Sequence, residues 1–169
     1  MVGAFALSVA DAVHTAVSDR GHSGAAPAAL TTLLAYPGSS IDRLRRALAL
    51  THSGGVRLVD RLEAGGLVRR TAARDGRVAA LELTVRGKRV ACDILERRRR
   101  AVADLLAPLS AAERRTLGAL LERMLEPIPD DRRDLERICR LCDYWVCDGS
   151  TQACPVGRGA RAKRDAAPR

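Results

Sequence analysis

Apolar residues recur at helical spacing along much of the chain, and the gaps between these stretches predict where elements begin and end. Phe5, Val9, Val13 and Val17 follow one another at steps of four, which places them on one face of a helix. We therefore predict a first helix over residues 3–19.

A helix-turn-helix unit is predicted next. Residues 26–36 form a short helix that stops at Pro37-Gly38, a strong turn signal. Hydroxyl residues then mark the starts of two further helices, since their side chains cap helix N-termini; the candidates are Ser39 or Ser40 for one and Thr51 or Ser53 for the other. The second of these helices ends at Gly65-Gly66, because glycine takes the left-handed geometry found at helix C-termini.

Alternation replaces the helical pattern over the following segment. Residues 67–72 and 77–83 are predicted as two strands joined by Arg74-Asp75-Gly76, and Asp-Gly favours a hairpin turn. Thr84 then caps a long helix that runs through Leu106.

The C-terminal third contains two further predicted helices. Ser110 and Glu113 form a capping box that opens a Leu-rich helix, and Pro127 and Pro129 end it. Asp130 opens a shorter helical segment. The tail after Pro155 has little to bury, so we predict that residues 158–169 are disordered.

This order of elements predicts a mainly α (α+β) fold: a winged helix-turn-helix with a two-stranded wing, and long helices that form a dimerisation region. The regions expected are an N-terminal dimerisation helix, a DNA-binding domain, C-terminal dimerisation helices, a cysteine-rich metal-binding extension and a basic disordered tail, at residues 1–24, 25–84, 85–128, 129–157 and 158–169.

Composition supports a polyanionic partner. The chain of 169 residues has a net charge of +9, which favours nucleic acid; an anionic membrane surface is the rival. No run of roughly 18 apolar residues is present to span a membrane. The apolar N-terminus lacks the basic residues of a secretory signal, so we expect a cytoplasmic protein with reduced thiols.

The leading end of a recognition helix must be small or polar for its backbone to approach the bases. Here that end holds Gly54 and Gly55, which close approach to DNA would explain; the alternative is a fraying first turn. Arg57 is the best candidate for contacting a base edge, and His52 is either a neighbouring contact or a solvated histidine.

The wing is strongly basic. Its arginines are suited to the minor groove, and Asp75 could hold one of them by an ion pair; alternatively the arginines only add solubility. Our candidate DNA contacts are Ser40, Thr51, His52, Ser53, Gly54, Arg57, Arg69, Arg74, Asp75 and Arg77.

Several short motifs carry a family resemblance. They are Leu58-Val59-Asp60-Arg61-Leu62-Glu63, Gly66-Leu67-Val68-Arg69-Arg70, the pair Asp75 and Arg77, Leu83-Thr84 with Gly87, and Leu109-Ser110 with Glu113. Over about residues 5–127 the sequence resembles the MarR family of winged-helix regulators. The paired glycines and the cysteine-bearing extension depart from the family pattern.

The resemblance implies a homodimer, with the first helix and the last two long helices intertwined, that binds a palindromic operator in double-stranded DNA and usually represses transcription. It implies a small-molecule or oxidant signal felt where the dimer base meets the winged lobes. By matching wing positions, Asp75 would brace the wing and Arg77 would enter the minor groove. The Leu-rich stripes independently favour a partner chain. Arg98 near the inward face either pairs with a carboxylate or lines a ligand cavity.

Four of the five cysteines lie within sixteen residues, at Cys139, Cys142, Cys147 and Cys154. The spacing C-x2-C-x4-C-x6-C-P predicts a tetrahedral thiolate site for a metal. The compact run ending in Cys-Pro favours an iron–sulfur cluster; zinc is the alternative, and a redox-active dithiol or ordinary buried cysteines remain open.

Three residues near the cysteines also have predicted roles. Tyr144 and Trp145 are expected to shield the metal site or dock it onto the dimer base. Cys92 lies apart from the cluster, and we expect it to be a small core residue.

The leading hypothesis is a DNA-binding repressor whose four-cysteine cluster senses redox or iron state. The alternative is the same repressor responding to an organic ligand, with structural zinc. An electron-transfer or cluster-carrier protein would explain the cysteines but not the wing. No nucleophilic triad, phosphate loop or carboxylate pair stands out, so we do not expect an enzyme.

Overall fold

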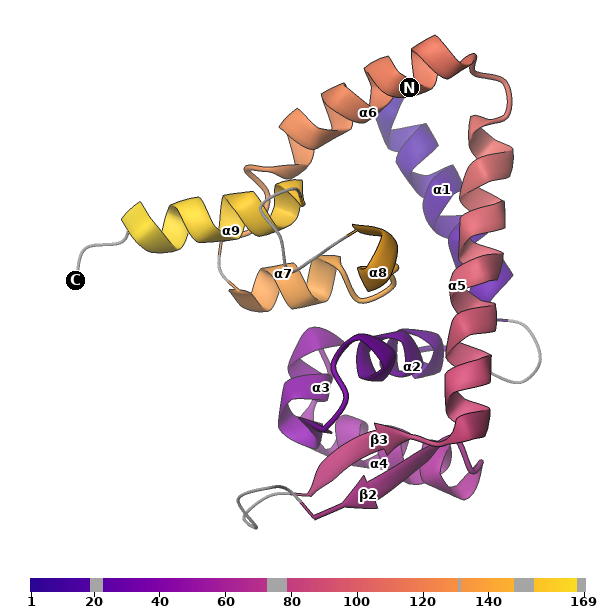
Figure 1. Ribbon diagram of the computed structural model, residues 1–169, viewed down its shortest axis with the longest axis vertical. Coiled ribbons are helices and arrows are strands. Elements are labelled where there is room, and N and C mark those ends of the chain that lie inside the picture. Colours follow the sequence, from indigo (N-terminus) through magenta and orange to yellow (C-terminus); the bar gives the residue numbers. More distant parts are fainter. Residues whose placement is uncertain (19–22, 73–78, 131, 148–153, 167–169) are drawn as a thin grey trace.

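The computed structural model describes residues 1–18, 23–72, 79–130, 132–147 and 154–166. Its elements, in chain order, are α1 (Val2–Val17), α2 (Ala26–Ala35), β1 (Ser39–Ser40), α3 (Ile41–Ala47), α4 (His52–Ala64), β2 (Val68–Thr71), β3 (Ala80–Leu83), α5 (Val85–Leu106), α6 (Ala111–Leu125), α7 (Arg132–Ile138), α8 (Tyr144–Cys147) and α9 (Pro155–Ala166). The predicted winged helix-turn-helix with long flanking helices is confirmed (Figure 1).

Local capping signals place the helix starts. The side chains of Ser40, Thr51, Thr84 and Ser110 each accept a hydrogen bond from a backbone N–H three residues ahead, so each satisfies one of the unpaired donors of a first turn. At Ser110 the capping box is complete, because the Glu113 carboxylate accepts from the Ser110 backbone N–H at 2.8 Å.

The sheet is antiparallel and has a third short strand that we did not predict. β3 lies in the middle, between β2 and the two-residue β1, with Ser39 opposite Leu81 and Ser40 opposite Ala80. Ser40 is therefore both the last residue of β1 and the N-cap of α3, and this position sets the residue at which α3 begins.

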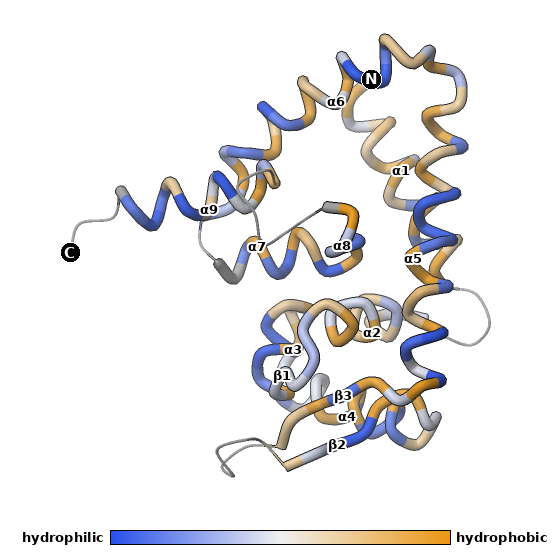
Figure 2. Tube along the Cα trace, viewed as in Figure 1, coloured by the Kyte–Doolittle hydropathy of each residue, from blue (hydrophilic) through white to orange (hydrophobic). Residues whose placement is uncertain are grey.

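One hydrophobic core joins the sheet to α2, α3, α4 and α5. Its largest fully buried side chains include Leu30, Leu33, Leu44, Leu58 and Leu81, and burying each contributes about 1.5–3 kcal/mol. Figure 2 shows hydrophobic positions concentrated in α1, α2 and β3 and a mostly hydrophilic α9. The small domain is thus stabilised mainly by aliphatic packing.

The long helix α5 leaves this domain at a fixed angle. Thr84 donates its hydroxyl to the Gly66 carbonyl at 2.7 Å, and Gly87 lies so close to the strand that an added Cβ would be 2.0 Å from the Leu67 carbonyl oxygen. α1 packs along α5 away from the sheet, and α6 follows at the far end (Figure 1).

Two predictions about the C-terminal half and α5 are wrong. Residues 158–166 of the tail predicted as disordered belong to helix α9, in which Val156 and Ala160 are buried because the helix packs against α6 and α7; residues 167–169 lie outside the described part. Cys92, predicted in the core, is exposed on α5. Among the described helices, none is both long and apolar enough to cross a membrane.

Replacing Gly87 by alanine tests the junction between sheet and α5. We expect Gly87→Ala to lower the free energy of unfolding by about 1–3 kcal/mol, because the new methyl group meets backbone that cannot move aside. Chemical denaturation followed by circular dichroism measures this. The matched control is Gly118→Ala on α6, where nothing lies within 4 Å of an added Cβ. A Gly87→Ala protein as stable as wild type would contradict the close contact.

Candidate functional site

The leading end of α4 is an exposed polar surface. Thr51 caps the helix by accepting from the Gly54 N–H at 3.1 Å, and the side chains of Thr51, His52 and Ser53 are exposed beside it. The Thr51 and Ser53 hydroxyl oxygens are 3.4 Å apart. These small polar groups at a helix N-terminus suit contact with phosphates or base edges.

Arg57 lies one turn further along α4 and is exposed. In the described part of the chain its guanidinium has no ion pair, so its charge is not offset by a neighbouring carboxylate. An arginine at this place on a recognition helix can donate two hydrogen bonds to a guanine edge.

The two glycines of α4 have different roles. Gly55 is buried, and a Cβ there would be 2.9 Å from the Cβ of Arg45 on α3. Gly55 is therefore required for the close packing of α3 on α4, a reason the sequence analysis did not consider. A Cβ at Gly54 would be 3.0 Å from the capping Thr51 oxygen, and Gly54 lies nearer the exposed tip.

The arginines of strand β2 are paired within the domain. Arg69 lies 2.6 Å from Glu82 on β3, and Arg70 bridges Asp60 and Glu63 of α4. The hydrogen bonds that the Arg70 guanidinium donates to the carboxylates of Asp60 and Glu63 raise the pKa of Arg70 above its usual value. Much of the charge that made this hairpin look strongly basic is therefore locally neutralised.

The remaining predicted DNA contacts divide into two groups. Ser40 is half-buried, and its hydroxyl oxygen accepts from the Arg43 N–H at 3.2 Å as the α3 cap. Arg74, Asp75 and Arg77 at the wing tip lie outside the described residues. Among the described residues, the candidate DNA-contacting surface therefore consists of the N-terminal end of α4 and the exposed Arg57.

Three cysteines line one small cavity between the C-terminal extension and the winged domain. Cys139 at the end of α7, Cys142 just after it and Cys154 before α9 border a cavity of about 30 Å³, together with Tyr36 and Tyr144. A cavity of this size holds an ion or a very few waters, not an organic molecule. Cys147 is on α8, and its side chain lies outside the described part.

The Cys142 thiol is poised to ionise. A hydrogen bond with the Cys139 side chain lowers the pKa of Cys142 to about 6, and Arg98 and Arg140 act in the same direction against burial and Asp143. Thiolates are the ligand form of cysteine. Yet among the described side chains, no three His, Cys, Asp or Glu residues are arranged to hold a metal ion.

The part of the extension around α8 contacts the winged domain, whereas α9 packs against α6. The Tyr144 ring packs edge-on against Tyr36, which follows α2, with ring centroids 5.5 Å apart. Trp145 is 73% exposed, so it does not shield the cysteines. Tyr144 borders the cysteine cavity, in line with the predicted shielding role, and its described ring contacts are with Tyr36 and Trp145.

Comparison with known proteins supports the winged-helix assignment. Residues 21–78 match the sequence profile of the MarR family. This segment is therefore similar to a MarR-family domain. No curated protein sequence matches this chain.

Solved structures agree. A MarR family protein from Bacillus stearothermophilus is 25% identical, with a TM-score of 0.65 over 73% of this chain and 86% of that one. The PcaV transcriptional regulator from Streptomyces coelicolor is 26% identical, with a TM-score of 0.56 over 73% and 94%. A MarR family protein from Mycobacterium tuberculosis, in complex with salicylic acid, is 29% identical, with a TM-score of 0.57 over 73% and 96%. The winged domain of this chain is therefore similar in fold to those of MarR-family proteins.

Sequence reasoning missed the residues that attach the cysteine segment to the winged domain. Arg43 of α3 lies 2.9 Å from Glu136 of α7 and 4.2 Å above the Tyr36 ring. Thr31 of α2 donates to the Arg140 carbonyl at 2.7 Å. These partners are about a hundred residues apart, and no local pattern could have paired them.

Proposed function

We propose that this protein is a homodimeric, sequence-specific double-stranded DNA-binding regulator, acting as a repressor, whose activity is modulated at its four cysteines. The observation that carries the DNA-binding part is the exposed N-terminal end of α4. Arg57, about one turn after His52 and Ser53, is exposed there and has no ion pair among the described residues. A protein with a net charge of +9 also attracts DNA at long range.

Dimerisation is supported by uncovered apolar surface. In α6 no residue is buried, and Leu120, Leu121 and Met124 are 49, 41 and 55% exposed. Phe5 of α1 is also exposed. An apolar surface of this kind marks an interaction site, and a second copy would cover it by symmetry. A symmetric pair then places two α4 helices for a palindromic operator, with half-sites about 34 Å apart.

For the cysteine site we propose an iron–sulfur cluster held by Cys139, Cys142, Cys147 and Cys154. The compact C-x2-C-x4-C-x6-C-P run supports it; three of these residues border one ion-sized cavity, although the described side chains are not arranged to hold a metal ion. A bound cluster would supply one-electron redox chemistry, so that its oxidation or loss reports oxidant or iron supply.

A second candidate keeps the repressor and makes zinc a structural ion with an organic effector. Two observations favour it. The cavity at the cysteines is ion-sized, and a separate cavity of about 840 Å³ lies between α1, α2, α5 and α7, lined by Arg98 and Arg140. That volume is typical of ligand pockets, and the two cations suit a carboxylate such as the salicylic acid bound by the Mycobacterium tuberculosis protein.

Arginine substitutions test DNA binding. We expect Arg57→Ala to weaken binding to a duplex selected by the wild-type protein from a random pool, by about 1–3 kcal/mol, since it removes a base-reading side chain. Arg69→Ala should weaken binding far less, because Glu82 already pairs with Arg69. Fluorescence anisotropy at several salt concentrations measures both. Equal affinities for wild type and Arg57→Ala, with folding intact, would rule out the proposed reading surface.

Colour and metal content test the cysteine site. Protein purified without oxygen should be brown and contain iron and sulfide; Cys142→Ser should lose both, because it removes a thiolate ligand. Cys92→Ser, which removes the exposed cysteine of α5, is the matched control and should keep the colour. Colourless protein with one zinc per chain would contradict the iron–sulfur cluster and support the structural zinc of the second candidate. Protein without any metal would contradict both.

A further inference from the structure

Exposed arginines extend the polar surface of α4 and continue onto the start of α5. We propose that Arg61, Arg86 and Arg89, here called the cationic row, bind the phosphate backbone of the duplex whose bases α4 contacts. Phosphate contacts fix the position of a protein on the duplex, whereas base contacts select the sequence. This inference rests on the proposed DNA-binding function and adds a second class of contact to it.

The first part of the cationic row lies on α4. Ser53, Arg57 and Arg61 follow one another at steps of four residues, which places them on one side of the helix, and all three are exposed. The opposite side of α4 is buried through residues such as Leu58 and Leu62. Arg61 is therefore directed away from the core and belongs to the same exposed surface as Arg57.

The second part lies at the start of α5, beside the end of α4. The Gly65 N–H donates to the Arg61 carbonyl at 3.0 Å, and the Gly65 carbonyl accepts from the Arg86 guanidinium at 3.2 Å. This bond uses only part of the donor capacity of the guanidinium, which leaves further N–H groups for an anion. Arg89 is exposed one turn after Arg86, on the same side of α5. The cationic row therefore continues from one helix to the other.

The charge of the cationic row is not offset by neighbouring acids. In the described part of the chain, no carboxylate forms an ion pair with any of its three arginines. The nearby acids have other partners: Asp60 and Glu63 of α4 are held by Arg70, and Asp93 of α5 lies 2.9 Å from Arg97. The positive charge of the cationic row is therefore available to an external anion.

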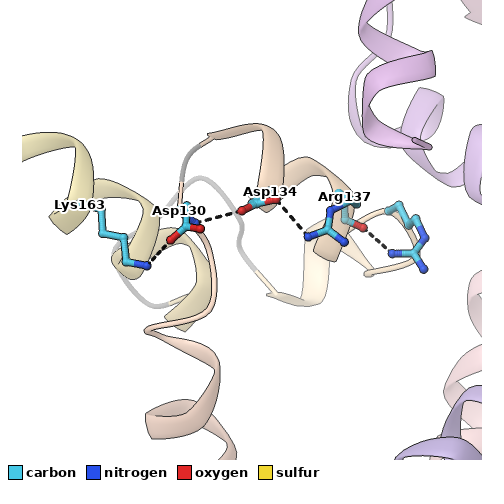
Figure 3. A network of polar contacts seen from close by, with 5 residues as sticks. Asp130, Asp134, Arg137 and Lys163 are labelled. Atoms are coloured by element: carbon cyan, nitrogen blue, oxygen red, sulfur yellow. Dashed lines mark hydrogen bonds and ion pairs between the residues drawn. The ribbon is translucent and has the colours of Figure 1, made fainter. Parts of the chain in front are cut away.

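The basic C-terminal segment provides a contrast. Lys163 of α9 pairs with Asp130 at 2.6 Å, and Arg137 of α7 donates to Asp134 at 3.1 Å (Figure 3). The Asp130 N–H donates to Asp134 at 3.1 Å, so these residues form one network. The charge of Lys163 and Arg137 is thus offset within the protein, unlike that of the cationic row.

The isolated fold gains little from these positive charges. Arg57 and Arg61 are like charges four residues apart, an arrangement that destabilises a helix. The first turn of α5 contains no acidic residue, and the cations near this end, among them Arg86, oppose the helix dipole. A polyanion bound along the cationic row offsets both effects.

The spacing along α4 fits a phosphate backbone beside the major groove. Arg61 lies eight residues after Ser53, or about 12 Å along the helix axis, and the major groove of B-DNA is about 12 Å wide. With the start of α4 against the base edges, the end of α4 reaches the backbone that borders the groove. Arg86, held beside this end through Gly65, reaches the same backbone.

Salt dependence distinguishes phosphate contacts from base contacts. Fluorescence anisotropy over a range of salt concentrations gives the Kd of the whole protein for the selected duplex and for an unrelated duplex of equal length. We expect Arg61→Ala and Arg89→Ala to weaken binding to both duplexes by the same factor. The slope of log Kd against log salt should fall by about 0.9 for each phosphate contact removed, or about 1.8 for a dimer that loses one contact in each half-site.

Two controls isolate the position of the charge. Arg115→Ala on α6 removes an exposed arginine that also has no ion pair among the described residues, and it should keep the wild-type slope. Arg86→Lys retains the charge and should keep the slope, whereas Arg86→Ala should lower it. Circular dichroism checks that each variant is folded.

The possible outcomes separate this inference from the proposed function. An unchanged slope in all three alanine variants of the cationic row, or an equal fall in Arg115→Ala, would overturn the row while leaving DNA binding in place. Weaker binding to the selected duplex alone would indicate base contacts and contradict phosphate binding. Variants that keep the duplex slope but lose binding to vesicles of anionic phospholipid would assign the row to a membrane surface instead. A wild-type protein that binds no duplex at low salt would overturn the proposed function itself.

Discussion

The geometry of the whole chain depends on the contact between the start of α5 and the end of the winged domain. The Gly87 backbone rests on the Leu67 carbonyl, and the Thr84 hydroxyl bonds to Gly66 beside it. Because α5 is a continuous helix of 22 residues, a small rotation at this contact becomes a large displacement at its far end. In the proposed dimer, the rigidity of this contact would help to set the spacing of the two winged domains.

Local physical signals made much of the fold predictable from sequence. Each of four capping side chains accepts a hydrogen bond from a backbone N–H only three residues further along its own helix; they are Ser40, Thr51, Thr84 and Ser110. Such helix starts can therefore be read from a short stretch of sequence. Helix α9 was missed for the opposite reason: its sequence is polar and glycine-rich, and its order comes from a seat on α6 formed more than thirty residues earlier. Likewise, the ion pair between Arg43 and Glu136 joins two helices that are far apart in the sequence, so it cannot be predicted from either segment alone.

The distribution of charged residues in the sequence predicted the candidate site less well than the capping residues predicted the helices. The number of arginines pointed to the hairpin, yet Arg69 pairs with Glu82 and Arg70 with Asp60 and Glu63, so a phosphate would compete with these carboxylates for either cation. The sequence singles out Arg57 by its place on the predicted recognition helix, and the structure adds that its side chain is exposed and has no ion pair among the described residues. Gly55 shows the same limit, because its partner Arg45 belongs to another helix.

The contacts that hold α7 and the residues after it against the winged domain are individually weak. A net hydrogen bond such as Thr31 to the Arg140 carbonyl contributes about 0.5–1.5 kcal/mol. The partly exposed Arg43–Glu136 pair adds about 0.2–1 kcal/mol after solvent screening. Together they amount to ~1–2 kcal/mol, and a difference of about 1.4 kcal/mol is tenfold in an equilibrium constant. A site that makes or breaks this connection can shift the orientation of the DNA-binding domain only by the difference in free energy between the two arrangements. Contacts of this strength therefore hold this segment against the winged domain less rigidly than a wholly buried interface would.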